Sequence, residues 1–403
     1  MGHELLAERM GRVKSSPVIA IADRAKAMKA EGRDVIALAQ GEPDMGTPTN
    51  ICEAAIRAIR EGETRYTPVD GTPALKRAIA RKFQRDHGLA FGSERIIVCT
   101  GGKQVLYNAL VATLSPGDEV LIPAPYWVSY PDMVNLTDGK PVAIACSEET
   151  GFKLTPEILE RAITARTRWL ILNSPSNPTG ASYSKEELRA IGDVLVRHPQ
   201  VLVMSDDIYE KMVHDGTLFS TIAESAPELG PRILTVNGVS KTYCMTGWRI
   251  GYGAGPRWLI DAMVAIQSQS TSNPSSVSQA AALEALEGPQ VFIETNNAVF
   301  RRRRDLVVDL LNAAEGLRCP VPQGAFYVYP SCAGVIGKST PGGRRIGDDV
   351  EFCAALLEDQ LVAVVPGAAF GLSPYFRISY ATSNEQLEEA CHRIQAFCAA
   401  LRA

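Results

Sequence analysis

The chain has 403 residues, which is more than one hydrophobic core usually holds, so its length predicts two or three domains. Apolar residues make up 46% of it and charged residues 21%, shares that are ordinary for a globular protein in water. A formal net charge of −4 gives no basic excess and argues against a nucleic-acid partner. No apolar run reaches about 18 residues and charges interrupt the N-terminal segment. We therefore expect no membrane insertion, no secretion and a cytoplasmic location.

Cysteine and histidine usage gives no sign of a metal site. The nine cysteines are an odd number and form no Cys-x-x-Cys pair, so we expect reduced, mostly buried thiols. The five histidines are isolated along the chain, without the spacing of a zinc-binding helix. We expect no metal ion.

The N-terminal region predicts a helix over residues 18–31 and a short apolar strand over residues 35–39. This strand runs directly into the sequence QGEPD at residues 40–44. A glycine at the end of a strand, here Gly41, lets a ligand approach the backbone closely, although an ordinary turn has the same appearance. A further helix is expected over residues 50–60.

A second segment has the pattern of an anion-binding site. After a helix over residues 74–87, an expected strand at residues 96–99 leads into Gly101 and Gly102, and a helix over residues 105–114 follows. A strand, a glycine pair and a helix direct free backbone N–H groups and the positive helix end at an anion. The spacing is not that of a Walker loop, so an ordinary helix start remains the alternative.

Two proline-rich loops follow expected strands. The loop PAPYWVSYP at residues 123–131 holds more aromatic residues than a core accommodates, which suggests that one of them forms a flat wall for a planar ligand. The strand expected at residues 169–173 enters SPSNPTG at residues 174–180, where two prolines force an irregular backbone. A helix then begins at Ser184 with the signature of a capping box.

Acidic residues end the next expected strand, residues 201–204. They are Asp206 and Asp207, with Tyr209 close behind. Side chains just beyond the carboxyl end of a strand lie where α/β sheets bind ligands. By this argument either aspartate can face the ligand.

Lys241 lies in the sequence NGVSKTYCMTGWRIGYGAG, residues 237–255, with small and hydroxyl-bearing neighbours. With few charges nearby, it can occupy a partly desolvated pocket and lose its proton, which is what an imine-forming amine requires. Arg249 would supply a fixed positive charge for a phosphate. A solvated surface lysine is the ordinary alternative. The later glycines resemble a dinucleotide fingerprint, but Pro256 replaces its third glycine and we reject that interpretation.

The C-terminal region predicts a long helix over residues 291–314 that connects two domains. Its arginine run, residues 301–304, is expected to be a solvated face. A strand is expected to open at residues 322–327, and residues 376–380 form a β-type run with Arg377 among apolar neighbours. A buried arginine needs an anionic partner, which is either a structural carboxylate or a ligand.

Read together, these motifs resemble those of the class I pyridoxal-phosphate aminotransferases. The strings GVSK at residues 238–241 and MTGWRIG at residues 245–251 are similar to the family's lysine signature, and the GEPD, YTP, SPSNPTG and FRISYA segments follow the family order. The resemblance extends over nearly the whole chain. Within the family it is closest to the bacterial aspartate and aspartate/prephenate aminotransferases.

The resemblance implies an α/β protein of fold type I, with a large domain around a mostly parallel, seven-stranded-type sheet and a smaller α+β domain. Residues 1–48 would form the N-terminal arm and part of the small domain. Residues 49–290 would form the large cofactor-binding domain, and residues 291–403 the interdomain helix and the small C-terminal domain.

The resemblance also implies which residues do the chemistry. Lys241 would bind pyridoxal 5'-phosphate covalently and move a proton, Asp206 would keep the pyridine nitrogen protonated, and Tyr209 would bond the ring hydroxyl. The remaining cofactor contacts would be Gly101, Gly102, Lys103, Trp127, Asn177, Ser240, Arg249 and, across a homodimer interface, Tyr66. The substrate contacts would be Gly41, Lys103, Trp127, Asn177 and Arg377.

Particular groups are implied for these contacts. Trp127 would stack on the pyridine ring and Asn177 would bond its hydroxyl. Gly41 and Arg377 would face the substrate α-carboxylate, and Lys103 the distal carboxylate of an acidic substrate. Two positions depart from close relatives, since Val18 replaces a common threonine and Gly238 a phosphate-binding serine of some members.

The expected activity is transamination by a ping-pong mechanism between an amino acid and a 2-oxo acid, with L-aspartate and 2-oxoglutarate as the first choice. Prephenate, aromatic or other amino acids are alternatives. A lyase or decarboxylase would use the same Lys241 and Asp206. A non-catalytic regulator is a further alternative, but the family motifs begin too early to leave room for a DNA-binding domain.

Overall fold

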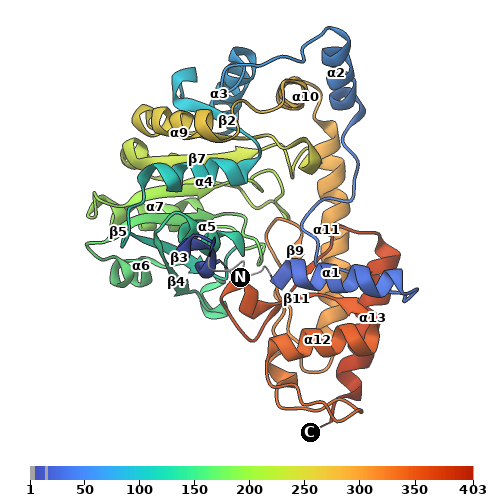
Figure 1. Ribbon diagram of the computed structural model, residues 1–403. Helices are drawn as coiled ribbons and strands as arrows, with labels where there is room; N and C mark the ends of the chain where they lie inside the picture. The colour runs from blue at the N-terminus through green and yellow to red at the C-terminus, as the bar shows by residue number, and fades with distance from the viewer. Residues whose placement is uncertain (1–4, 14–16, 403) are drawn as a thin grey trace.

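The computed structural model describes residues 5–13 and 17–402. A large sheet with its helices lies on one side of the molecule, the long helix α11 (Val291–Asn312) runs along its edge, and a smaller part packs around the lower half of that helix (Figure 1). Two expectations lie outside the described residues: the structure of residues 1–4 and 14–16 of the N-terminal arm, and the side chain of Val18. The domain boundaries given above stay predictions.

The large sheet has seven strands in the order β2-β8-β7-β6-β5-β3-β4. Their bounds are β2 (Ile96–Cys99), β3 (Glu119–Ala124), β4 (Lys140–Ala145), β5 (Thr167–Asn173), β6 (Leu202–Asp206), β7 (Ile233–Gly238) and β8 (Gly251–Ala254). Only β8 runs antiparallel to its neighbours. The inner strands are mostly apolar and buried because helices cover both faces of the sheet. The predicted fold class is confirmed.

Successive side chains of a strand point to opposite faces of the sheet, so the core of the large sheet consists of two layers. Val120 and Ile122 face helices α4 (Gly102–Thr113), α5 (Ser129–Leu136) and α9 (Arg257–Ser270), whereas Leu121 faces the opposite layer. That layer contains α6 (Pro156–Ala162), α7 (Lys185–Val196) and α8 (Ile222–Ser225). The expected capping box starts α7, because Ser184 and Glu187 each accept a backbone N–H from the other. Helices α2 (Thr49–Arg60), α3 (Pro73–His87) and α10 (Ser276–Glu287) pack together near β2.

The smaller part combines both ends of the chain. Its antiparallel sheet has the order β11 (Val365–Pro366), β12 (Phe376–Ser379) and β9 (Tyr327–Val328), and β1 (Ile36–Ala37) pairs in parallel with β10 (Val362–Ala363). Helices α1 (Pro17–Ala30), α12 (Asp349–Gln360) and α13 (Asn384–Ala400) pack around these strands (Figure 1). One aromatic and aliphatic cluster holds α11, α12, α13 and this sheet together.

Three elements differ most from the expected bounds, and several others, such as β6, differ by one or two residues at an end. Helix α4 begins at Gly102, three residues early, because Gly101 takes a positive φ of 86° as the residue before the helix. Strand β1 spans two residues rather than residues 35–39. Strand β9 begins only at Tyr327, since the backbone at residues 323–325 bonds to Gly180 and Met212 instead of a strand.

The arginine run on α11 is only half solvated, so that prediction is partly wrong. Arg301 and Arg302 are exposed, but Arg303 and Arg304 are buried. Both Nη atoms of Arg303 donate to the carboxylate of Asp44 at 2.8 Å. Successive helix residues point about 100° apart, so four in a row cannot share one face. The pair ties the loop at residues 40–44 to α11.

The nine cysteines, all within the described residues, are free thiols, and all except Cys52 are buried, as expected. None of the helices in the described part of the chain combines the length and the apolar character needed to cross a bilayer.

Candidate active site

A cavity of about 460 Å³ lies where the carboxyl ends of β5 and β6 meet the loop at residues 40–44 and the small sheet. It is lined by most of the residues singled out from the sequence: Gly41, Gly102, Lys103, Trp127, Asn177, Asp206, Tyr209, Ser240, Lys241, Arg249 and Arg377. Gly101 lies immediately beside it, against Arg249. Tyr66 lies elsewhere, with 91% of its surface exposed.

Lys241 follows β7 and points toward the loop that contains Gly41. Its Nζ donates a hydrogen bond to the Gly41 carbonyl oxygen. Burial, helped by Arg377 and Arg249 and opposed by Glu42 and Asp206, lowers the pKa of Lys241 to about 8. A sizeable fraction of the amine is therefore neutral near pH 7.5, as nucleophilic attack on a carbonyl carbon requires.

The two aspartates at the end of β6 point to different places. Asp206 lines the cavity, and its Oδ2 accepts a hydrogen bond from Tyr130 Oη at 2.6 Å. Asp207 does not line the cavity and accepts from Ser205 Oγ at 2.7 Å. Burial raises the pKa of Asp206 to about 6, opposed by the Tyr130 hydrogen bond, so its carboxylate is charged at neutral pH. Of the two aspartates left open by the sequence, Asp206 is therefore the one placed to meet a ligand.

One end of the cavity is suited to an anion. The N-terminus of α4 opens there at Gly102, and the exposed Arg249 holds its Nη1 against the Thr246 carbonyl oxygen at 2.9 Å. Gly101 has a φ of +86°, which other residues rarely adopt, and a Cβ atom added there would meet the Arg249 guanidinium and displace it from the helix start. Ser240 lines the same cavity. Helix end and guanidinium together attract a multiply charged anion.

Arg377 lies at the other end and is buried. Its Nη1 donates to Asn177 Oδ1 at 2.8 Å and its Nη2 to the Ala39 carbonyl oxygen at 2.6 Å. Tyr327 and Phe370 contact its guanidinium, with ring centroids at 4.6 and 5.0 Å. Among the described residues no carboxylate pairs with it, so the structural salt bridge considered from the sequence is wrong. Such an uncompensated buried cation favours binding of a carboxylate.

The side walls are aromatic. Lys103 Nζ lies 4.7 Å from the Trp127 ring centroid, and Tyr130 meets Trp127 edge to face at 5.4 Å. Burial, and then Arg249, lower the pKa of Lys103. Tyr209 Oη lies 3.0 Å from Tyr327 Oη. The cavity therefore offers a flat apolar face with cations at its rim.

Nine residues that line this cavity were not singled out from the sequence: Gln40, Glu42, Leu106, Val128, Tyr130, Asn173, Ile208, Thr246 and Tyr327. Asn173 ends β5, and its Nδ2 donates to the Asp206 carbonyl oxygen at 2.8 Å. Its place at the carboxyl end of a strand was an available signal. Glu42 and Tyr130 lay within motifs already quoted. Nothing in the sequence pointed to Tyr327, which is 118 positions from its partner Tyr209.

A mostly parallel seven-stranded sheet with a desolvated lysine at its carboxyl edge defines an α/β enzyme of fold type I. The chain belongs to the aminotransferase class I and II family, whose model matches residues 33–394, and it is an aminotransferase. This confirms the family resemblance drawn from the sequence.

Individual relatives support this membership. The chain is 63% identical to the aspartate/prephenate aminotransferase of Cereibacter sphaeroides (strain ATCC 17029 / ATH 2.4.9), over 98% of this chain and 99% of that protein. It is 58% identical in sequence to the crystal structure of the Rhizobium meliloti aspartate aminotransferase, with a TM-score of 0.97 over 98% and 99% of the two chains. The Thermus thermophilus aspartate aminotransferase with maleate is 42% identical, with a TM-score of 0.91 over 97% and 99%.

Proposed function

We propose that this aminotransferase binds pyridoxal 5'-phosphate in the cavity and transfers the amino group of L-aspartate to 2-oxoglutarate. The observation that carries the proposal is the charge of the cavity wall. Four cations line it, Lys103, Lys241, Arg249 and Arg377, against the carboxylates of Glu42 and Asp206. A phosphorylated cofactor and a dicarboxylic substrate together supply the negative charge that this wall attracts.

The residues present fit the cofactor. The N-terminus of α4, at Gly101 and Gly102, would hold the phosphate together with Arg249 and Ser240. Trp127 would cover the ring, and Asp206 would hold a proton on the ring nitrogen. Asn177 uses its Oδ1 for Arg377, so its Nδ2 would donate to the ring hydroxyl beside Tyr209. When bound, the cofactor supplies a carbonyl carbon for the amine and a ring that withdraws electrons from the substrate Cα.

Lys241 is the group placed to move protons. Its depressed pKa would let the neutral Nζ take the proton from the substrate Cα and deliver it to the carbonyl-derived carbon of the cofactor, which is the proton shift that amino transfer requires. Arg377 would bind the α-carboxylate, with Gly41 beside it, and so orient the Cα–H bond toward Lys241. The same wall that binds the substrate therefore also aligns it for proton transfer.

The choice of substrate is supported by Lys103 and by the relatives. Lys103 Nζ lies over the Trp127 ring, and no carboxylate of the described residues is within hydrogen-bonding distance of it. It would therefore attract the distal carboxylate of a dicarboxylic substrate. Maleate, in the Thermus thermophilus structure, is a dicarboxylate. The name of the Cereibacter sphaeroides relative adds prephenate, which is the second candidate substrate.

The test is absorbance of purified protein loaded with pyridoxal phosphate. L-Aspartate added without an oxo acid is expected to convert the carbonyl form of the cofactor to its amino form, and 2-oxoglutarate to reverse the change. Response to prephenate but not to 2-oxoglutarate as acceptor would support the second candidate. If the cofactor binds but its absorbance changes with neither substrate pair, the proposed substrates are wrong. If the protein does not bind pyridoxal phosphate, the proposed function as a whole is wrong.

Lys103 gives a sharper test of substrate selection. We expect Lys103→Met to lower kcat/KM for L-aspartate by roughly tenfold to a hundredfold, because a charge-assisted hydrogen bond contributes about 1.5–3 kcal/mol. L-Alanine has no distal carboxylate, so its kcat/KM should change little. Steady-state rates with both amino acids measure the difference. An equal loss for the two would place Lys103 at the cofactor instead.

The depressed pKa of Lys241 predicts a pH dependence. Only the neutral form of a lysine is nucleophilic, so the rate at which apoprotein binds pyridoxal phosphate should rise with pH, reach half its maximum near pH 8 and then level off, rather than near the ordinary value of about 10.4. The Glu42→Gln substitution removes a carboxylate that raises the pKa of Lys241. The midpoint of the rate–pH curve of this variant should therefore move to lower pH. Stopped-flow absorbance measures both, with the exposed Glu186→Gln as control. A Glu42→Gln midpoint at or above that of the parent would contradict the prediction.

We also propose a homodimer in which Tyr66 reaches the phosphate of the partner. Its 91% exposure on this chain is expected of a side chain that is covered on association, and Ile59 on α2 is a further exposed apolar side chain. Sedimentation analysis tests the assembly. Mixing Tyr66→Phe with Lys241→Ala chains tests the crossing, since one hybrid site would then carry neither substitution and should recover activity.

A further inference from the structure

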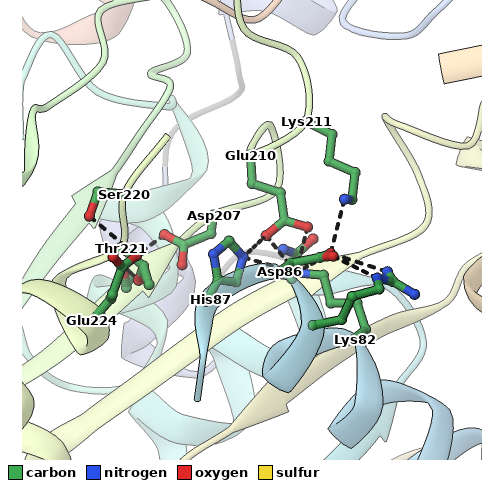
Figure 2. Close-up of polar contacts among 12 residues, drawn as sticks. Lys82, Asp86, His87, Asp207, Glu210, Lys211, Ser220, Thr221 and Glu224 are labelled. Atoms are coloured by element: carbon green, nitrogen blue, oxygen red, sulfur yellow. Dashed lines mark hydrogen bonds and ion pairs between the residues drawn. The ribbon is translucent and has the colours of Figure 1, made fainter. Parts of the chain in front are cut away.

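A cluster of buried charges lies behind the turn that carries Asp206 and Tyr209, on the side away from the cavity. It contains Lys82, Asp86 and His87 from α3 with Glu210 and Lys211 from the turn, and we name it the α3–turn ion cluster. Figure 2 shows the side chains of α3 and of the turn directed at one another. The chain separates Lys82 from Glu210 by 128 positions.

Glu210 is the centre of the cluster. Lys82 Nζ donates to it at 2.5 Å, and His87 Nε2 lies 2.7 Å from its Oε2 (Figure 2). Lys82 Nζ also lies 3.3 Å from His87 Nε2. Beside them, Lys211 Nζ pairs with Asp86 Oδ2 at 2.9 Å. Two neighbouring residues of the turn are thus each held by an opposite charge from one helix.

The three central side chains are almost inaccessible, with exposures of 1% for Lys82, 5% for Glu210 and 7% for His87. Burial disfavours the charged carboxylate, yet Lys82 and His87 hold the pKa of Glu210 at about 2. A buried ion pair adds little net stability compared with apolar residues of the same shape. What it does impose is geometry, because each charge is costly in any arrangement that separates it from its partner.

This geometry is transmitted to the site by a short, hydrogen-bonded turn. The Glu210 N–H donates to the Asp207 carbonyl oxygen and the Asp207 N–H to the Val236 carbonyl oxygen of β7, both at 2.9 Å. Asp206 and Tyr209 face the cavity while Glu210 faces α3. A displacement of Glu210 therefore has to move Tyr209, its neighbour, or distort the turn.

We infer that Lys82, His87 and Glu210 are positioning residues, which fix the turn so that Asp206 and Tyr209 meet the cofactor ring at the correct distance. The inference rests on the proposed function of the cavity and goes further in naming residues that touch neither cofactor nor substrate. Small displacements matter at such a site, since about 1 Å of misplacement costs roughly a hundredfold in rate.

The test separates geometry from folding. Glu210→Gln alone leaves Lys82 buried without its main counter-ion and is expected to lower the thermal unfolding temperature. The double variant Lys82→Met/Glu210→Gln removes both charges with little change in shape, and should recover most of that temperature. Its kcat should nevertheless fall roughly tenfold or more with a smaller change in KM, and the apoprotein should bind pyridoxal phosphate about tenfold more weakly.

The readouts are steady-state kinetics and a tryptophan-fluorescence titration of apoprotein with pyridoxal phosphate, at a temperature where each variant is folded. The matched control is Arg81→Met/Glu287→Gln, which removes an exposed ion pair from the same helix α3 and should leave every value unchanged. His87→Gln keeps a hydrogen-bonding group and serves as a milder variant, with weaker cofactor binding expected.

Parent-like kcat and cofactor affinity in the folded double variant, or in His87→Gln if the double variant does not fold, would overturn the inference and leave the cluster with a folding role only. Failure of the proposed function would have a different result. If the proposed function were wrong, the parent protein itself would not bind pyridoxal phosphate or convert L-aspartate.

Discussion

Replacing Lys241 by alanine is expected to lower the turnover number with L-aspartate and 2-oxoglutarate by about 10⁴-fold or more, since general acid–base catalysis alone contributes up to about 10⁴. Among the described residues, this side chain is the one amine that both contacts the Gly41 loop and has its pKa lowered to about 8. Its loss removes both the covalent attachment of the cofactor and the base that moves the Cα proton. Steady-state rates in excess pyridoxal phosphate measure the loss.

The matched control is Lys185→Ala, at an exposed lysine paired with Glu224 on the surface. It should keep the parent activity. Lys241→Ala should also unfold at a temperature equal to or above that of the parent, because a depressed pKa means that burying this amine costs free energy. A variant that loses activity because it is unfolded, or one that keeps a tenth of the parent rate, would contradict the assignment of Lys241.

The fold was predictable from the sequence because its signals are local. The inner strands β5, β6 and β7 each contain an apolar run, as is typical of parallel strands whose two faces are covered by helices. Ser184 starts α7 with a capping box that can be read from four residues. The family resemblance then supplied the arrangement of domains, which no single element determines.

The direction of individual side chains was less predictable. Asp206 and Asp207 are adjacent, and which of them faces the cavity depends on where β6 ends and its turn begins, a matter of one residue. The prediction that the whole arginine run is solvated was partly wrong for a similar reason, because it depends on which way each side chain points. Composition predicts a solvated run, but the rotation of α11 turns Arg303 and Arg304 inward, toward Asp44 and Asp215.

Contacts between distant parts of the chain could not be predicted at all. Lys82, His87 and Glu210 are unremarkable helix or turn residues in the sequence, and only the packing of α3 against the turn after β6 makes them a cluster. Tyr209 and Tyr327 likewise meet only when the small sheet closes over the large one. Most of the polar groups that line the cavity therefore lie in motifs that the sequence analysis quoted, whereas the groups that hold them in place do not.

Asp206→Asn is expected to lower kcat by about 10²–10³-fold, the usual cost of removing one electrostatic group directed at the reacting centre. The amide matches the carboxylate in shape, and its Oδ1 can still accept the hydrogen bond from Tyr130 Oη. What it lacks is the negative charge, present on Asp206 above about pH 6, that would keep the ring nitrogen protonated. KM for L-aspartate should change much less, because Arg377 and Lys103 remain.

Asp207→Asn is the natural comparison, since it makes the same change one residue further along. Burial raises the pKa of Asp207 to about 7, so this group is already partly neutral at physiological pH and a neutral amide resembles that form. Its carboxylate bonds Ser205, away from the cavity. Folded Asp207→Asn protein should therefore keep a kcat close to that of the parent. The reverse result, with Asp207→Asn inactive and Asp206→Asn active, would mean that the wrong aspartate faces the ring.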